Sequence, residues 1–173
     1  MKKKIILFCA SVLAIVLILI IVLIPRNAVV IKNAAVSPIN GDIAISYMNS
    51  GIGASVIKVQ IYDRNGALLY SKSFFDSGTP HMVYDEEGNL CISVGEKSRR
   101  FCYDRQGGTA NSDMTVDEIN AIGSFSGWKK SAGKYKYTLD GYQYIYEKPS
   151  LFNRRAKLTV SHEGTNRVIY ESK

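Results

Sequence analysis

The side chains best suited to contact a ligand are aromatic and lie between residues 128 and 146. The set is Trp128, Tyr135, Tyr137, Tyr142, Tyr144 and Tyr146. Aromatic ladders with nearby basic residues, here Arg154 and Arg155, can bind sugars or peptide segments. Strand tyrosines are also ordinary β-formers that cap a core with their rings. The cluster therefore predicts either a binding face or a structural role, and we favour the structural role.

Cys91 and Cys102 lie symmetrically within a predicted hairpin that spans residues 89–104. The register that sets them opposite each other also pairs Leu90 with Tyr103 and Ile92 with Phe101 on the other, apolar face. Cross-strand partners have Cα atoms about 4.5–5.5 Å apart, which a disulfide accepts. Because an exported location permits oxidation, we expect a disulfide, with two reduced thiols as the alternative.

Catalytic and metal-binding patterns are missing from the sequence. The two histidines, His81 and His162, stand beside turns and accompany no nucleophile motif. There is no glycine-rich phosphate loop, no zinc-ligand spacing and no carboxylate pair whose geometry could be argued. We therefore expect no enzyme activity, no cofactor and no metal, with an enzyme of unrecognised type as the remote alternative.

Short strands separated by tight turns must position these residues. Apolar side chains alternate with polar ones at 43–47, 57–61 and 156–160, which is typical of half-buried strands. Pairs such as Asn65-Gly66 and Asp140-Gly141 lie between such segments and tolerate the positive φ of tight hairpins. The pattern predicts an all-β domain of antiparallel hairpins.

A five-residue repeat, Tyr-Asp-x-x-Gly, begins at Tyr62, Tyr84 and Tyr103. Each copy ends a predicted strand, where the Asp can accept backbone N–H groups and the Gly can take the left-handed conformation. These strand-turn-strand units resemble the blades of β-propellers of the NHL type. The resemblance implies blade-like sheets, although closed propellers use four to eight blades and this chain offers about three.

The first unit would comprise strands at 29–37, 42–48, 56–63 and 67–75, a second would start at Pro80, and the third would comprise 135–139, 142–147, 156–161 and 167–171. We expect an incomplete, open stack of such units, with a β-sandwich or an oligomer as alternatives. Thr115 and Glu118 have the spacing of a helix capping box, which predicts a short helix near 115–122. This helix would replace or cover a sheet edge.

An apolar segment at residues 5–24 precedes the β-rich part and contains no charge. As a helix it would be about 30 Å long, the thickness of the hydrocarbon core of a bilayer. It is longer than a signal peptide's apolar region and is followed by no small-x-small cleavage site, so we expect an uncleaved signal anchor. The lysines at positions 2–4 keep residues 1–4 in the cytoplasm and place 25–173 outside the cell membrane.

The net charge is +7, and beyond residue 4 there are 19 Lys and Arg against 15 acids. The excess lies after Trp128, and exported basic surfaces meet anionic lipids or envelope polymers more readily than nucleic acid. We therefore expect a membrane-anchored, non-catalytic binding module that contacts an envelope protein or an anionic polymer. The alternative is an accessory subunit of a membrane complex, contacted through its transmembrane helix.

Overall fold

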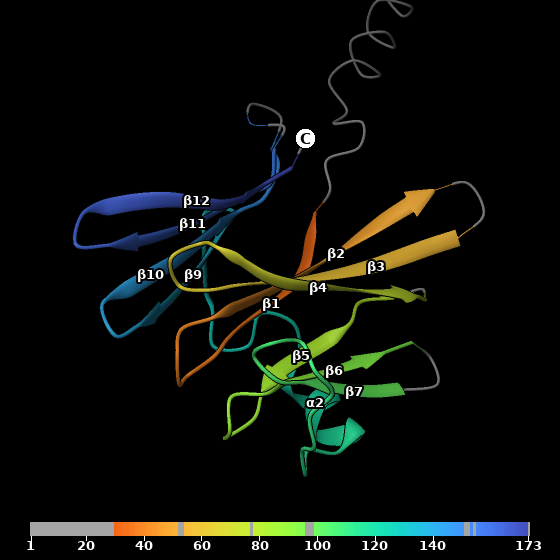
Figure 1. Cartoon of the computed structure of the whole chain (residues 1–173). Helices are drawn as coiled ribbons and strands as arrows, with labels where there is room; N and C mark the ends of the chain where they lie inside the picture. The colour runs from red at the N-terminus through yellow and green to blue at the C-terminus, as the bar shows by residue number, and fades with distance from the viewer. Residues whose placement is uncertain are drawn as a thin grey trace, which may run out of the picture.

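The computed structural model describes residues 30–51, 54–76, 78–95, 99–150, 153 and 155–172. These residues form three antiparallel sheets in which consecutive strands are neighbours (Figure 1). The four-stranded sheet contains β1 (Ile31–Val36), β2 (Ile43–Gly51), β3 (Ala54–Tyr62) and β4 (Leu68–Phe75). The three-stranded sheet contains β5 (His81–Tyr84), β6 (Leu90–Val94) and β7 (Arg99–Tyr103). The five-stranded sheet contains β8 (Lys129–Ser131), β9 (Lys134–Leu139), β10 (Tyr142–Glu147), β11 (Lys157–His162) and β12 (Thr165–Glu171).

The four-stranded sheet lies between the other two. One of its faces joins a core cluster with the five-stranded sheet, where Ile43 and Ile45 meet Tyr144 and Leu158. Its other face joins a second cluster with the three-stranded sheet, where Val59 and Ile92 are buried together. The protein therefore has three layers of sheet, and the described residues do not close into a propeller ring.

Strand β2 shows why one sheet can be covered on both sides. Ile43 and Ile45 point to the five-stranded sheet, while Ala44 between them points to the three-stranded sheet, and all three are completely buried. Because successive side chains alternate between faces, an apolar residue at each successive position buries both faces. The small Ala44 leaves room for the larger side chains of β3, which supply most of the second face.

The three Tyr-Asp-x-x-Gly turns fold as the sequence predicts. The carboxylate of Asp63 accepts the N–H of Ala67 at 2.8 Å, and Asp85 and Asp104 each accept two backbone N–H groups in the same way. The glycines at positions 66, 88 and 107 have φ between 82° and 84°, the left-handed region that glycine enters without strain. The repeat is thus a turn-forming device.

The predicted helix is α2 (Val116–Ile122), and its capping box is complete: Thr115 accepts the N–H of Glu118, and the Glu118 carboxylate accepts the N–H of Thr115. It was expected to replace or cover a sheet edge. Instead Ile119, its buried residue, packs with Cys91 and Cys102 against a face of the three-stranded sheet. Without α2, that face of the three-stranded sheet would expose apolar surface. The helix therefore completes a third core cluster, which contains Cys91, Cys102 and Ile119.

The strands of the first and third predicted units are confirmed, with β8 added to the third. The three layers differ from the two layers of a β-sandwich. The predicted membrane segment at residues 5–24 lies outside the described residues, and within them no helix is long and apolar enough to cross a bilayer.

Candidate functional site

The tyrosines of β9 and β10 lie on one face, as their alternation predicts. Tyr137 is opposite Tyr144 and Tyr135 is opposite Tyr146 in the strand register. This face points inward, toward the central sheet, where Tyr144 and Tyr146 are completely buried. Burial excludes these two rings from any surface that a ligand could contact.

The hydroxyl groups of the two buried tyrosines are used to join two sheets. The Tyr144 hydroxyl donates to the carbonyl oxygen of Gly41 at 2.6 Å, and the Tyr146 hydroxyl accepts the N–H of Ile31 at 3.1 Å. Gly41 and Ile31 lie at the two ends of the β1–β2 hairpin, so each end is attached to β10. Burial raises the pKa of both phenols well above 10, which keeps them neutral.

Phe125 belongs to this aromatic cluster but was missed by the sequence analysis. Its ring lies 4.4 Å from that of Tyr135 and 5.5 Å from that of Tyr146, and its N–H donates to Asn33 at 2.9 Å. Phe125 has a φ of 56°, an unusual value for a large side chain. The only sequence signal was the Ser-Phe-Ser-Gly turn after the predicted helix, which marks a turn but not the direction of the ring.

Trp128, another residue of the predicted binding face, is also buried and packs edge-on against Phe125. Tyr137 and Tyr142 are partly exposed, and Tyr142 stacks on His162 with ring centres 3.9 Å apart. Arg155 is exposed and pairs with Glu171 at 3.4 Å, whereas Arg154 lies outside the described residues. Residues of the predicted face are thus divided between the interior and several parts of the surface.

Tyr135 has two lysines near its ring, whereas Tyr142 has one guanidinium group, that of Arg64, 5.6 Å from its ring centre. Lys148 lies 4.9 Å from the centre of the Tyr135 ring and Lys130 lies 6.0 Å away. Both lysines are exposed, whereas the neighbouring Lys134 is paired with Glu147 at 2.6 Å. An amphipathic ring near two exposed ammonium groups is suited to anions carried on a partly apolar partner.

These residues belong to a larger basic surface where β1 begins and β10 ends. We call it the basic end and define it as residues 30–32, 130–134, 147–148, 155–157 and 171–172. Strand pairing aligns Lys134, Glu147, Lys157 and Glu171 in one row across the sheet, and the Ile31–Tyr146 bond brings the start of β1 to the same place. The basic end carries six cationic side chains and two carboxylates.

The opposite end of the strands is acidic. We call it the turn end and define it as residues 37–42, 63–67, 85–89, 104–108, 140–141 and 163–164, which include the three repeated turns. These residues carry eight carboxylates and two guanidinium groups, and two further cations reach them, because Arg167 donates to the carbonyl of Asn65 and Lys72 donates to the carbonyl of Gly107. Arg105 joins two of the turns by a bidentate ion pair with the buried Asp42, at 2.7 and 3.2 Å. The charges of the domain are therefore separated along its strands.

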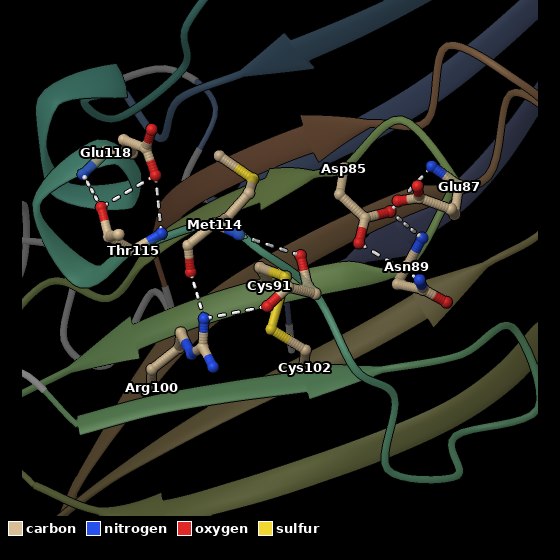
Figure 2. The surroundings of a disulfide bond; sticks show 10 residues. Asp85, Glu87, Asn89, Cys91, Arg100, Cys102, Met114, Thr115 and Glu118 are labelled. Atoms are coloured by element: carbon tan, nitrogen blue, oxygen red, sulfur yellow. Dashed lines mark hydrogen bonds between the residues drawn. A yellow bond between two sulfur atoms is a disulfide. The ribbon is translucent and has the colours of Figure 1, made fainter.

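Cys91 and Cys102 face each other across β6 and β7, with Cα atoms 4.2 Å apart and a disulfide between them (Figure 2). The predicted register of this hairpin is confirmed, including the pairs Leu90–Tyr103 and Ile92–Phe101. Arg100 of β7 donates to the carbonyl groups of Ser112 and Met114, which holds the segment before α2 over the sulfur atoms (Figure 2). Both cysteines are buried, so this disulfide has a structural position and no access to a substrate.

His81 begins β5, and His162 ends β11, where its ring stacks on Tyr142. In the described part of the chain, no three His, Cys, Asp or Glu side chains gather as metal ligands. Among the same residues, the His81 ring and the Tyr84 hydroxyl each have a buried polar atom without a hydrogen-bond partner.

No model of a known protein family matches this chain, and no curated protein or solved structure is significantly similar to it.

Proposed function

We propose that this protein is a membrane-tethered, extracytoplasmic binding module that holds an anionic partner at its basic end and carries out no reaction. The tether is the apolar segment at 5–24, whose flanking lysines favour a cytoplasmic N-terminus. The domain beyond it would then be displayed outside the cell membrane, as a stack of blade-like sheets.

The observation that carries the proposal is the free cationic surface around Tyr135. Lys130 and Lys148 are exposed and lie within about 6 Å of the centre of a partly exposed ring, and neither is in an ion pair within the part of the chain that the structure describes. The hydroxyl groups of Tyr144 and Tyr146 are instead used internally, to bind Gly41 and Ile31. The ammonium groups of Lys130 and Lys148 are exposed and can contact a partner.

Retention on a polyanion resin tests this surface. The full-length protein in a neutral detergent should bind an immobilised sulfated polysaccharide and elute with salt. The double variant Lys130→Glu/Lys148→Glu should elute at clearly lower salt, because two attractive charges become repulsive.

The matched control is Lys129→Glu/Lys136→Glu, which changes the net charge by the same amount. Lys129 and Lys136 are also exposed and pair with each other across β8 and β9, but they lie outside the basic end. Equal losses of retention in the two variants would show that net charge alone determines binding and would contradict a defined surface.

A protein partner, as in an accessory subunit of a membrane complex, is favoured by one other observation. Strand β4 is an edge of the central sheet, and Phe75 and Leu68 on it are 79% and 52% exposed. However, β4 has a bulge near Leu68, and its Lys72 amine is held by the carbonyl of Gly107 at 2.8 Å. Bulges and lysines are features that prevent strand addition at an edge, so we rank this function second.

A further inference from the structure

We propose that the basic end rests on the anionic lipid headgroups of the same membrane that holds residues 5–24, and that the turn end points away from it. This inference rests on the proposed function, because it requires the tether. It adds the identity of the partner and the orientation of the domain.

The length of the connection limits where the domain can lie. Six residues, 25–30, separate the end of the apolar segment from the first residue of β1. Even a fully extended chain of this length reaches only about 20 Å. The start of β1 must therefore stay close to the headgroups, and the Ile31–Tyr146 hydrogen bond keeps the end of β10 there with it.

The residues at the start of β11 and at the end of β12 belong to the same surface as the start of β1. Ala156 and Ser172 exchange two hydrogen bonds of 2.8 and 2.9 Å, which fixes the start of β11 beside the end of β12. Figure 1 shows this part of the five-stranded sheet on the side from which the chain enters β1. The surface that the short connection holds near the bilayer is thus the basic one.

Charge then selects one orientation of the domain on the bilayer. The basic end has six cationic side chains against two carboxylates, while the turn end has eight carboxylates against four cations, counting Arg167 and Lys72, which donate to its carbonyl groups. A negative lipid surface attracts the first and repels the second, and both forces favour the same orientation. Each Lys or Arg near an anionic bilayer strengthens partition about fivefold.

Side-chain chemistry at the basic end fits the interfacial region. Lys32, Lys130 and Lys148 are exposed, and no ion pair involves them among the residues that the structure describes. Tyr135, close to two of these lysines, is partly exposed and has the amphipathic ring that is enriched at membrane–water interfaces. A soluble polymer would not need this alignment with the point where the chain leaves the membrane.

Lysine footprinting of the full chain in nanodiscs tests the orientation. The protein is placed in discs of phosphatidylcholine alone or with about one third phosphatidylglycerol, treated with an amine-acetylating reagent and analysed by mass spectrometry. We expect the rates for Lys130 and Lys148 in anionic discs to be at least about threefold lower than in neutral discs, and this protection to vanish in high salt. The rate for Lys136, outside the basic end, should be the same in both discs.

Two variants complete the test, with Lys157 as the reporter that both retain. In the variant Lys130→Glu/Lys148→Glu, Lys157 should no longer be protected from acetylation in anionic discs. In the control Lys129→Glu/Lys136→Glu, Lys157 should remain protected. Equal rates in neutral and anionic discs for the unaltered protein would overturn the proposal. Protection that appears only when poly(glycerol phosphate) is added to neutral discs would also overturn it, in favour of a polymer partner.

Alkaline carbonate extraction of the same protein from vesicles distinguishes a failure of the tether from a failure of the headgroup contact. If the protein resists carbonate extraction but its lysines show no protection in anionic discs, the tether is supported and the headgroup contact is contradicted. If carbonate releases the protein from vesicles of either composition, both the tether and the proposed function are contradicted.

Discussion

At the scale of single residues, two tyrosine hydroxyls connect sheets that are far apart in the sequence. Tyr144 donates to Gly41 and Tyr146 accepts from Ile31, and both rings are inaccessible to solvent. Each bond satisfies a backbone group at an end of the β1–β2 hairpin. The residues that first resemble a ligand-binding ladder thus hold the start of the domain in place.

Replacing Tyr146 by Phe should destabilise the protein by about 1–3 kcal/mol, because the buried N–H of Ile31 loses its acceptor. Tyr142→Phe, on the same strand face but partly exposed, should change the stability much less. Urea unfolding of the full chain in detergent, followed by circular dichroism, measures both. Equal stability of the unaltered protein and Tyr146→Phe would contradict the role of this bond.

Alkaline pH should also destabilise the fold. Burial raises the pKa of Tyr62 and Tyr170 to about 12, and raises those of Tyr144 and Tyr146 further. An unfolded tyrosine ionises near pH 10, so above that pH the unfolded state releases protons that the folded state retains. The contribution of these phenols is therefore complete below about pH 10 and is lost as the pH rises through about 12.

Unfolding at pH 8 and at pH 11, with tyrosinate absorbance recorded at each step, measures this effect. Tyrosinate should appear with unfolding at pH 11, and the midpoint should fall relative to pH 8. Full tyrosine ionisation at pH 11 in a protein that is still folded would contradict the burial of these rings.

At the scale of strands and turns, the sequence predicted the local structure well. The symmetric spacing of Cys91 and Cys102 identified the register of β6 and β7, and the Tyr-Asp-x-x-Gly repeat identified three turns. These features depend on residues close in the chain, so their chemistry is readable from the sequence. The position of α2 was not readable, because Ile119 packs on a face that only the folded sheet creates.

Two turn glycines differ in what surrounds them, which allows a matched comparison. A Cβ atom at Gly66 would lie 2.4 Å from a methyl carbon of Ile169 on β12, whereas a Cβ at Gly164 would meet nothing within 4 Å. Both have positive φ, 82° and 78°, so an alanine is strained at either position. The backbone strain is therefore shared, and only Gly66 adds a clash between sheets.

Gly164→Ala should cost about 1–2 kcal/mol of stability, from the left-handed backbone alone. Gly66→Ala should cost a further 1–3 kcal/mol or so, because Ile169 must move within a packed core. Thermal and urea unfolding of the two variants compare these values. A similar loss of stability in Gly66→Ala and Gly164→Ala would mean that the turn between β3 and β4 does not pack closely against Ile169 of β12.

At the scale of the whole molecule, the sequence predicted the sheets but not their order in space. The central sheet is the first in the chain, and its role depends on β2, where Ala44 lies between two isoleucines. A strand in which small and large apolar residues alternate can belong to a sheet with one buried face or with two. The three layers could therefore not be derived from the sequence of β2. For the tyrosines of β9 and β10, the register and the favoured role in covering a core were foreseen, but the hydrogen bonds to Ile31 and Gly41 were not.

The separation of charge is likewise a property of the assembled molecule. The acids of the turn end come from six turns spread over the chain, and the cations of the basic end come from both termini of the domain and the strands between. The sequence showed a basic excess after Trp128, but strand pairing was needed to collect these residues at one end. We propose that this polarity orients the β-rich domain on the surface of a membrane.

The proposed tether, which would hold the domain outside the cell membrane, can be tested directly with a dual reporter. Alkaline phosphatase, active only after export, and green fluorescent protein, fluorescent in the cytosol, are fused separately after Lys173 of the full chain in a bacterial host. We predict phosphatase activity in the membrane fraction, carried by a protein whose intact mass includes residues 5–24, and no fluorescence. A fluorescent cytosolic fusion, or an active fusion that has lost residues 5–24 and is released from the membrane, would contradict the account.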